Sequence, residues 1–125
     1  MKKEELRNWI SAYIRYQEIE NNVSEDNPDW WAVQKFFDLG PDHPEFCWKA
    51  ILGILGQKPN NSVIQILAAG PLEDLIEDHG EKYIDEIEDE AKRDPDFKHL
   101  LGGVWESSTP EVWSRILKAR DNKSW

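Results

Sequence analysis

The chain has 125 residues, with 25 Asp or Glu against 15 Lys or Arg, so its formal net charge is −10 at pH 7. Seven Trp, four Phe and three Tyr supply enough apolar surface for a folded core, which excludes a disordered acidic tail. The acidic balance argues against direct binding to nucleic acid or to an anionic membrane, because both partners require cationic surfaces.

The residues at the N-terminus and the single cysteine favour a cytoplasmic protein. Cys47 is the only cysteine, so no internal disulfide can form, as is usual in a reducing compartment. The charged N-terminus leads into an amphipathic pattern and lacks the apolar core of a secretory signal. No run approaches the ~20 apolar residues that are needed to cross a bilayer, so we expect no membrane association.

In chain order, the first elements are predicted to be helices. Apolar residues recur at helical spacing over residues 3–20, which predicts an amphipathic helix there. Asn27-Pro28 is typical of an N-cap followed by proline at the first helical position, and Gly40-Pro41 ends this second, aromatic helix. Asp42 and Glu45 have the spacing of a capping box and predict the start of a third helix.

The middle of the chain contains the strongest helix boundary signals. Residues 63–69 could by composition form a strand, but a single strand has no partner, so we expect a helix. Gly70 predicts a left-handed stop, and Pro71 predicts the first turn of the next helix. A second stop is expected at His79-Gly80, followed by a carboxylate-rich helix over residues 81–94.

Two further helices complete an all-α chain. Asp94-Pro95 predicts the cap of a short helix, and Ser108 with Glu111 predicts a capping box that opens the last one. Short helices joined by short turns favour antiparallel pairs. We therefore expect a single domain over residues 1–125 with seven or eight short helices, for which an irregular HEAT-like stack is one arrangement.

One pattern in the middle of the chain resembles a known family. The residues that carry it are Leu67-Ala-Ala-Gly-Pro-Leu-Glu-Asp-Leu-Ile, His79-Gly80, Asp94-Pro95 with Phe97, and Leu101-Gly-Gly-Val-Trp105. Over about residues 60–106, this pattern resembles a bacterial family of small proteins known only as a domain of unknown function. The resemblance implies a bacterial origin and a helical fold, and it assigns no activity.

The reactive side chains do not form a pattern typical of catalysis. His43, His79 and His99 are isolated, and no Cys or His cluster has the spacing of a zinc site. His79 is better explained as a helix C-terminal cap than as a catalytic group. Cys47 lies between aromatic residues, as a packed core thiol would. We expect a protein that is not an enzyme and that has no metal or other cofactor.

The negative charge is concentrated in one segment. From Glu73 to Asp96 there are twelve Asp or Glu against three Lys or Arg, so this segment carries −9 and the other 101 residues carry −1. Like charges four residues apart on a helix cost a few tenths of a kcal/mol each. The excess either serves solubility alone or is compensated by a basic partner.

Two functional hypotheses follow. In the first, the protein binds and neutralises a basic protein such as a toxin or effector, as immunity proteins do for nuclease toxins, and acts as a monomer or weak dimer. The predicted partner-binding residues are Glu81, Asp85, Glu86, Asp89 and Glu90.

In the second hypothesis, the protein is a helical adaptor or scaffold that binds a protein partner through its Trp-rich face. Trp30 and Trp31 would provide this face. Adjacent helical residues point about 100° apart, so we expect one Trp to pack inside and the other to lie at the surface, where Trp is an effective binding anchor.

Overall fold

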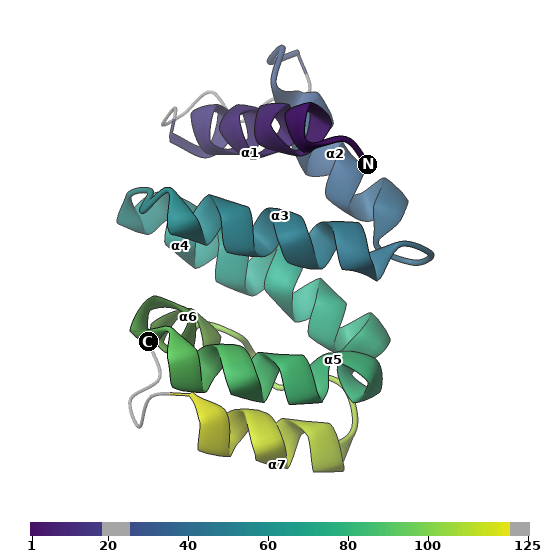
Figure 1. Ribbon diagram of the computed structural model, residues 1–125, viewed down its shortest axis with the longest axis vertical. Coiled ribbons are helices and arrows are strands. Elements are labelled where there is room, and N and C mark those ends of the chain that lie inside the picture. The colour runs from purple at the N-terminus through teal and green to yellow at the C-terminus, as the bar shows by residue number, and fades with distance from the viewer. Residues whose placement is uncertain (19–25, 121–125) are drawn as a thin grey trace. The chain divides into compact units, whose positions relative to one another are not determined.

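The computed structural model describes residues 1–18 and 26–120 (Figure 1). Every regular element in these residues is helical, which confirms the all-α prediction. The elements are α1 (Lys3–Glu18), α2 (Trp30–Leu39), α3 (Pro44–Gly56), α4 (Asn61–Leu67), the π-helical turn η1 (Ala68–Leu72), α5 (Glu73–Arg93), α6 (Pro95–Leu101) and α7 (Pro110–Ala119). The last two residues of the helix predicted over 3–20 lie outside the described residues.

The chain divides into two compact units, residues 1–66 and residues 67–125, and each is described by itself. The first contains α1, α2, α3 and nearly all of α4, and the second contains η1, α5, α6 and α7. The single domain and the HEAT-like stack stay predictions.

In the first unit, α2 and α3 pack on α1 through an aromatic core. Trp9 is fully buried, and its ring centroid lies 4.6 Å from that of Phe36. The indole Nε1–H of Trp9 donates to the backbone carbonyl of Ala32 at 2.8 Å. A buried indole needs such a partner, so this bond allows the largest side chain of α1 to enter the core.

The start of α2 differs from the prediction. The helix begins at Trp30, and the side-chain oxygen of Asn27 accepts the backbone N–H of Asp29 at 2.8 Å. Asn27 therefore caps a turn that precedes the helix, and the prediction of Pro28 at the first helical position was wrong by two residues. The predicted end is confirmed, because Gly40 is the C-cap.

The start of α3 also lacks its predicted cap. Pro44 does occupy the first turn, but the N-cap residue is His43 and its side chain makes no capping bond. Glu45 instead lies beside the His43 ring, with 3.4 Å between Oε1 and Nδ1. The predicted capping box of Asp42 and Glu45 was therefore wrong, because it places the N-cap one residue too early.

The helical path does not stop at Gly70. Residues 63–69 are helical, as expected, and α4 is followed directly by η1, in which the backbone N–H of Glu73 bonds to the carbonyl of Ala68. Gly70 does not have a positive φ angle. The ring of Pro71 would clash with the carbonyl four residues back in a regular α-helix, and a π turn is wider. The left-handed stop was a wrong prediction, because the turn accommodates the proline without ending the helix.

The second predicted stop is a kink inside α5. His79 has φ −137° and ψ 23°, which is not helical, and the helix resumes after it. Gly80 is buried beside the loop that precedes α7. A Cβ atom on Gly80 would lie 2.5 Å from Ser108 Oγ and 3.0 Å from Val112 Cγ1. Only glycine allows the kinked helix to approach the loop and α7 so closely.

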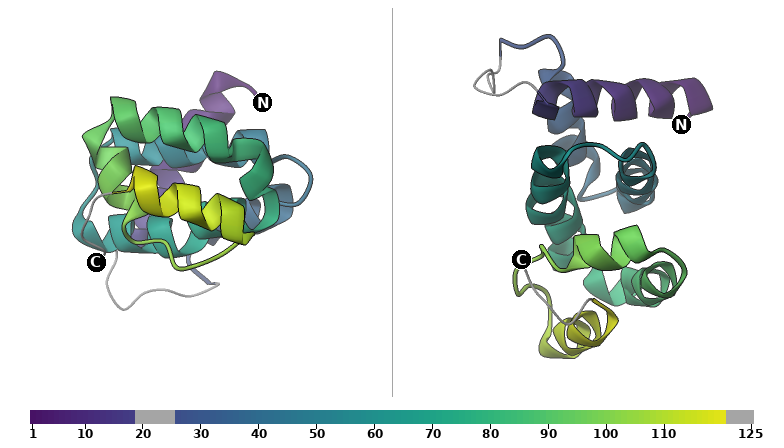
Figure 2. Two further views of the ribbon diagram at one scale, coloured as in Figure 1. Left: turned by 90° about the horizontal axis from the view of Figure 1, so that it is seen from below. Right: turned by 90° about the vertical axis from the view of Figure 1, so that its left-hand side faces the viewer.

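In the second unit, α6 and α7 both pack against α5 (Figures 1 and 2). The cap of α6 is as predicted, because the Asp94 side chain accepts the backbone N–H of Asp96 at 3.0 Å. The cap of α7 is Thr109, whose hydroxyl accepts the N–H of Val112 at 3.3 Å. The predicted capping residue, Ser108, instead has a φ of 67° and lies one position too early.

Candidate functional site

The loop between α6 and α7 is fastened to the first half of α5 by two carboxylates. Glu73 Oε1 accepts the backbone N–H of Trp105, and Glu77 Oε2 accepts that of Ser108, both at 2.8 Å. Glu73 and Glu77 lie four residues apart and so on one face of the helix. These bonds hold the loop while leaving the Trp105 residue 76% exposed, the most of any large hydrophobic residue described.

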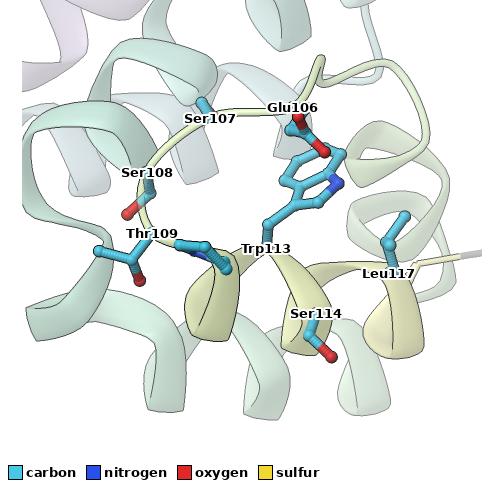
Figure 3. Close-up of a pocket in the computed structure, with 8 residues that line it drawn as sticks. Glu106, Ser107, Ser108, Thr109, Trp113, Ser114 and Leu117 are labelled. Atoms are coloured by element: carbon cyan, nitrogen blue, oxygen red, sulfur yellow. The ribbon is translucent and has the colours of Figure 1, made fainter.

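The loop and α7 enclose a groove of about 360 Å³, which we call the Trp113 groove (Figure 3). It is lined by residues 106–109 of the loop and by Pro110, Trp113, Ser114 and Leu117 of α7. In Figure 3, the Trp113 indole rises from α7 toward Glu106, and Leu117 follows one turn later. Leu117 is 45% exposed. The groove thus presents apolar side chains from a helix beneath a tethered loop.

A second hollow of about 430 Å³ lies at the α5 kink, and we call it the kink hollow. It is lined by residues 77–82 together with Ser108 and Thr109, which also line the Trp113 groove. Its α5 lining contains three carboxylates, those of Glu77, Asp78 and Glu81, and one ammonium group, that of Lys82. The two hollows therefore adjoin, and the second carries negative charge.

The predicted acidic residues all lie on the part of α5 that follows the kink at His79. Glu81, Asp85, Glu86 and Asp89 are exposed, and Glu90 is half-buried. The apolar seam of the same segment is buried; its members are Tyr83, Ile84, Ile87 and Ala91.

Two of these five carboxylates are neutralised within the protein. Asp85 lies 2.6 Å from Nη2 of Arg115, and Glu90 lies 2.5 Å from Nη2 of Arg93. The internal ion pairs reduce the like-charge repulsion on α5 without any partner.

Arg115 of α7 also binds Glu88, with Nε 3.0 Å from Oε2 and Nη2 in contact with Oε1. The hydrogen bonds from Arg115 lower the pKa of Glu88, and the bonds to Glu88 and Asp85 raise the pKa of Arg115. We did not predict this role. The available signal was the position of Arg115 beside Ile116, at the border of the buried stripe of α7.

The like charges have a different effect at the start of α5. The pKa of Asp74 is raised, first by partial burial and then by the neighbouring charges of Asp78 and Glu73. Repulsion between carboxylates is therefore still present where no arginine intervenes.

The Trp pair lies in the first unit. The Trp30 ring packs 5.7 Å from Tyr16, whereas Trp31 is 42% exposed, with Lys35 Nζ 5.9 Å from its ring centroid. Trp31 lies at the surface, as predicted, whereas Trp30 contacts Tyr16 but is only half-buried and does not lie inside the core. Their role in binding a partner stays a prediction. The Trp pair belongs to the first unit and the acidic residues of α5 to the second, so each unit contains one candidate site.

Cys47 is a core thiol, as predicted. It is buried, with Sγ 3.9 Å from the carbonyl oxygen of Phe36. Burial, aided by the charge of Glu45, raises the pKa of Cys47 to about 11. The sulfur therefore stays protonated at neutral pH, which makes it a poor nucleophile and metal ligand.

Within residues 1–18 and 26–120, no group of three or more His, Cys, Asp or Glu is arranged to hold a metal ion. In the same residues, no helix combines the length and the apolar character needed to cross a membrane.

Residues 19–124 match a family model described as a family of unknown function (DUF6869). This agrees with the resemblance to a domain of unknown function noted in the sequence. Comparisons with curated proteins and with solved structures found no match.

Proposed function

The chain belongs to this family of unknown function, and from its geometry we propose that it binds and neutralises a basic protein partner without catalysing a reaction. The exposed face of α5 is the proposed contact surface. The observation that carries the proposal is the set of Glu81, Glu86 and Asp89, which are exposed and have no ion-pair partner among the described residues.

The placement of the arginines supports this choice of residues. Arg115 forms ion pairs with Asp85 and Glu88, and Arg93 forms one with Glu90. These three carboxylates therefore already have cationic partners. Glu81, Glu86 and Asp89 form no ion pair among the described residues, and all three lie on the part of α5 that follows the kink. Charges fixed in this way attract a cationic partner over about a Debye length, roughly 8 Å at physiological salt, and accelerate its association.

The class of partner follows from the sign of the charge. Lys and Arg clusters on proteins that bind nucleic acids normally hold phosphates, and a protein that covers those clusters blocks phosphate binding. A nuclease toxin or another nucleic-acid-binding effector is such a partner, and the present chain would act as its immunity protein or inhibitor.

The proposal is tested with a basic protein encoded beside this gene. The triple variant Glu81→Lys, Glu86→Lys, Asp89→Lys should weaken binding by roughly 30-fold or more in isothermal titration, because attraction becomes repulsion. A matched control reverses three exposed carboxylates of the first unit: Glu18→Lys, Asp38→Lys and Asp42→Lys. The control changes net charge equally and should weaken binding far less. Equal effects of the two variants would refute a site on α5.

A second candidate function is an adaptor that uses α2. It is favoured by Trp31 and Phe37, which are 42% and 59% exposed on one helix. Under this alternative, Trp31→Ala should abolish partner binding, and the α5 triple variant should bind normally.

A further inference from the structure

We infer that the Trp113 groove and the kink hollow together form the docking site for one segment of the basic partner, in which an apolar side chain lies beside a Lys or Arg. This inference rests on the proposed function and identifies which segment of the partner is recognised. The apolar side chain would enter the groove between the loop and α7. The basic side chain would reach the carboxylates of the kink.

The Trp113 groove and the kink hollow adjoin one another. Both are lined by Ser108 and Thr109, and both belong to the second unit. One segment of a partner can therefore contact both hollows on either side of Ser108 and Thr109. Gly80 makes this possible, because it lets the loop lie directly against the kink.

The groove and its edge present exposed apolar side chains to a partner. Trp113 and Leu117 line the groove, and Leu117 is 45% exposed. Trp105 is not part of the lining, but it is 76% exposed and directly precedes the first lining residue, Glu106. Trp is enriched among the residues that dominate binding energy, and it is most effective when its neighbours exclude water. Carboxylates from α5 fasten the loop at the amides of Trp105 and Ser108, so little ordering is needed when a partner binds.

The negative charge of the two hollows determines which kind of segment they bind. Glu77, Asp78 and Glu81 line the kink hollow together with His79 and Lys82, and Glu106 lines the groove. These carboxylates repel a phosphate backbone or an acidic peptide and attract Lys or Arg. An apolar anchor flanked by a basic residue matches both hollows at once.

A suitable probe is a phage-displayed library of random 12-residue peptides, selected on the full chain. We expect the enriched peptides to combine Leu, Ile, Phe or Trp with Lys or Arg. An empty selection, or enrichment of peptides that lack either residue type, would overturn the inference.

One enriched peptide is then synthesised, and its binding is measured by fluorescence anisotropy. Leu117→Ser and Trp105→Ala should each weaken peptide binding at least fivefold. The double variant Asp78→Asn, Glu81→Gln should also weaken it at least fivefold. The control variants Ile66→Ser and Trp31→Ala change exposed side chains of the same types in the first unit and should have no effect. Unchanged binding of the Leu117 and Trp105 variants would overturn the site.

The same variants separate this inference from the proposed function. If Leu117→Ser and Trp105→Ala bind the neighbouring basic protein normally and Glu86→Lys with Asp89→Lys does not, α5 is the interface and the docking site is refuted. If Leu117→Ser and Trp105→Ala lose the partner and Glu86→Lys with Asp89→Lys does not, the proposed role of the exposed α5 face is refuted.

Discussion

Arg115 and Glu88 are joined by two hydrogen bonds, from Nε and Nη2 of the guanidinium to the two carboxylate oxygens. The same Nη2 also donates to Asp85 at 2.6 Å. One cation of α7 therefore serves two carboxylates of α5, and it fixes the packing of these helices while reducing the repulsion on the acidic helix.

Replacing Arg115 by Met should lower the urea midpoint of unfolding, because Glu88 and Asp85 lose their cation while the apolar stem is kept. The loss should shrink when salt is raised from 50 mM to about 0.5 M, where charges are screened. Lys118→Met is the matched control on the same helix and should change the midpoint little. Equal midpoints for the two variants would contradict this role of Arg115.

The pH dependence of stability should reveal the same contact. The pKa of Glu88 is lowered in the folded state, so its contribution is present above the unfolded value of about 4.3 and is lost as pH falls through the folded value. Glu88→Gln should therefore be less stable than the native chain at pH 7, and the two should converge below about pH 4. Because Glu88 is partly exposed, we expect the free energies of unfolding of the two proteins to differ by less than about 1 kcal/mol at pH 7. If the two proteins still differ in stability at pH 3, the ion pair between Glu88 and Arg115 is not the cause of the difference.

Gly80→Ala should destabilise the protein by about 1–3 kcal/mol, because the new Cβ overlaps the loop and α7. Gly56→Ala, where no atom lies within 4 Å of the new Cβ, should be neutral or stabilising. Ser108→Gly removes the hydroxyl that Gly80→Ala meets, and glycine also suits the φ of 67° at this position. The double variant should recover part of the loss in urea unfolding. If the double variant is no more stable than Gly80→Ala, the contact with the Ser108 hydroxyl is not the source of the destabilisation.

Glu77→Ala should release the loop without unfolding the helices. The amide of Ser108 loses its acceptor, so its hydrogen exchange should accelerate by roughly tenfold, as expected for the loss of a bond worth about 1 kcal/mol. Amides in the middle of α7 should exchange as before. Glu81→Ala is a control on the same helix, and an equal acceleration in both variants would exclude the tether.

Local signals predicted most of the helices. Asp94-Pro95 was assigned correctly because an N-cap and a first-turn proline act within a few residues. Gly70-Pro71 was interpreted wrongly, since a π turn and a stop–start boundary use the same two residues. The choice between them depends on the hydrogen bond from Glu73 to Ala68, which composition does not reveal.

The candidate site was harder to predict, because it depends on contacts between distant residues. The acidic helix was found from its charge alone. The tethers from Glu73 and Glu77 join residues more than 30 positions apart, and the like-charge spacing of α5 did not predict them. Trp105 was noted as part of the family pattern, but nothing local indicated that a fastened loop would leave it exposed.

The central claim is that the exposed carboxylates of α5 attract a basic protein. Its most direct test is the salt dependence of the association rate with the basic protein encoded next door, measured by stopped-flow for the native chain and for the Glu81→Lys, Glu86→Lys, Asp89→Lys variant. For the native chain, we predict a rate that falls by at least about tenfold between 50 mM and 500 mM salt, and for the variant a slower rate that does not fall. A native rate that is independent of salt, or a variant that associates as fast as the native chain, would contradict the claim.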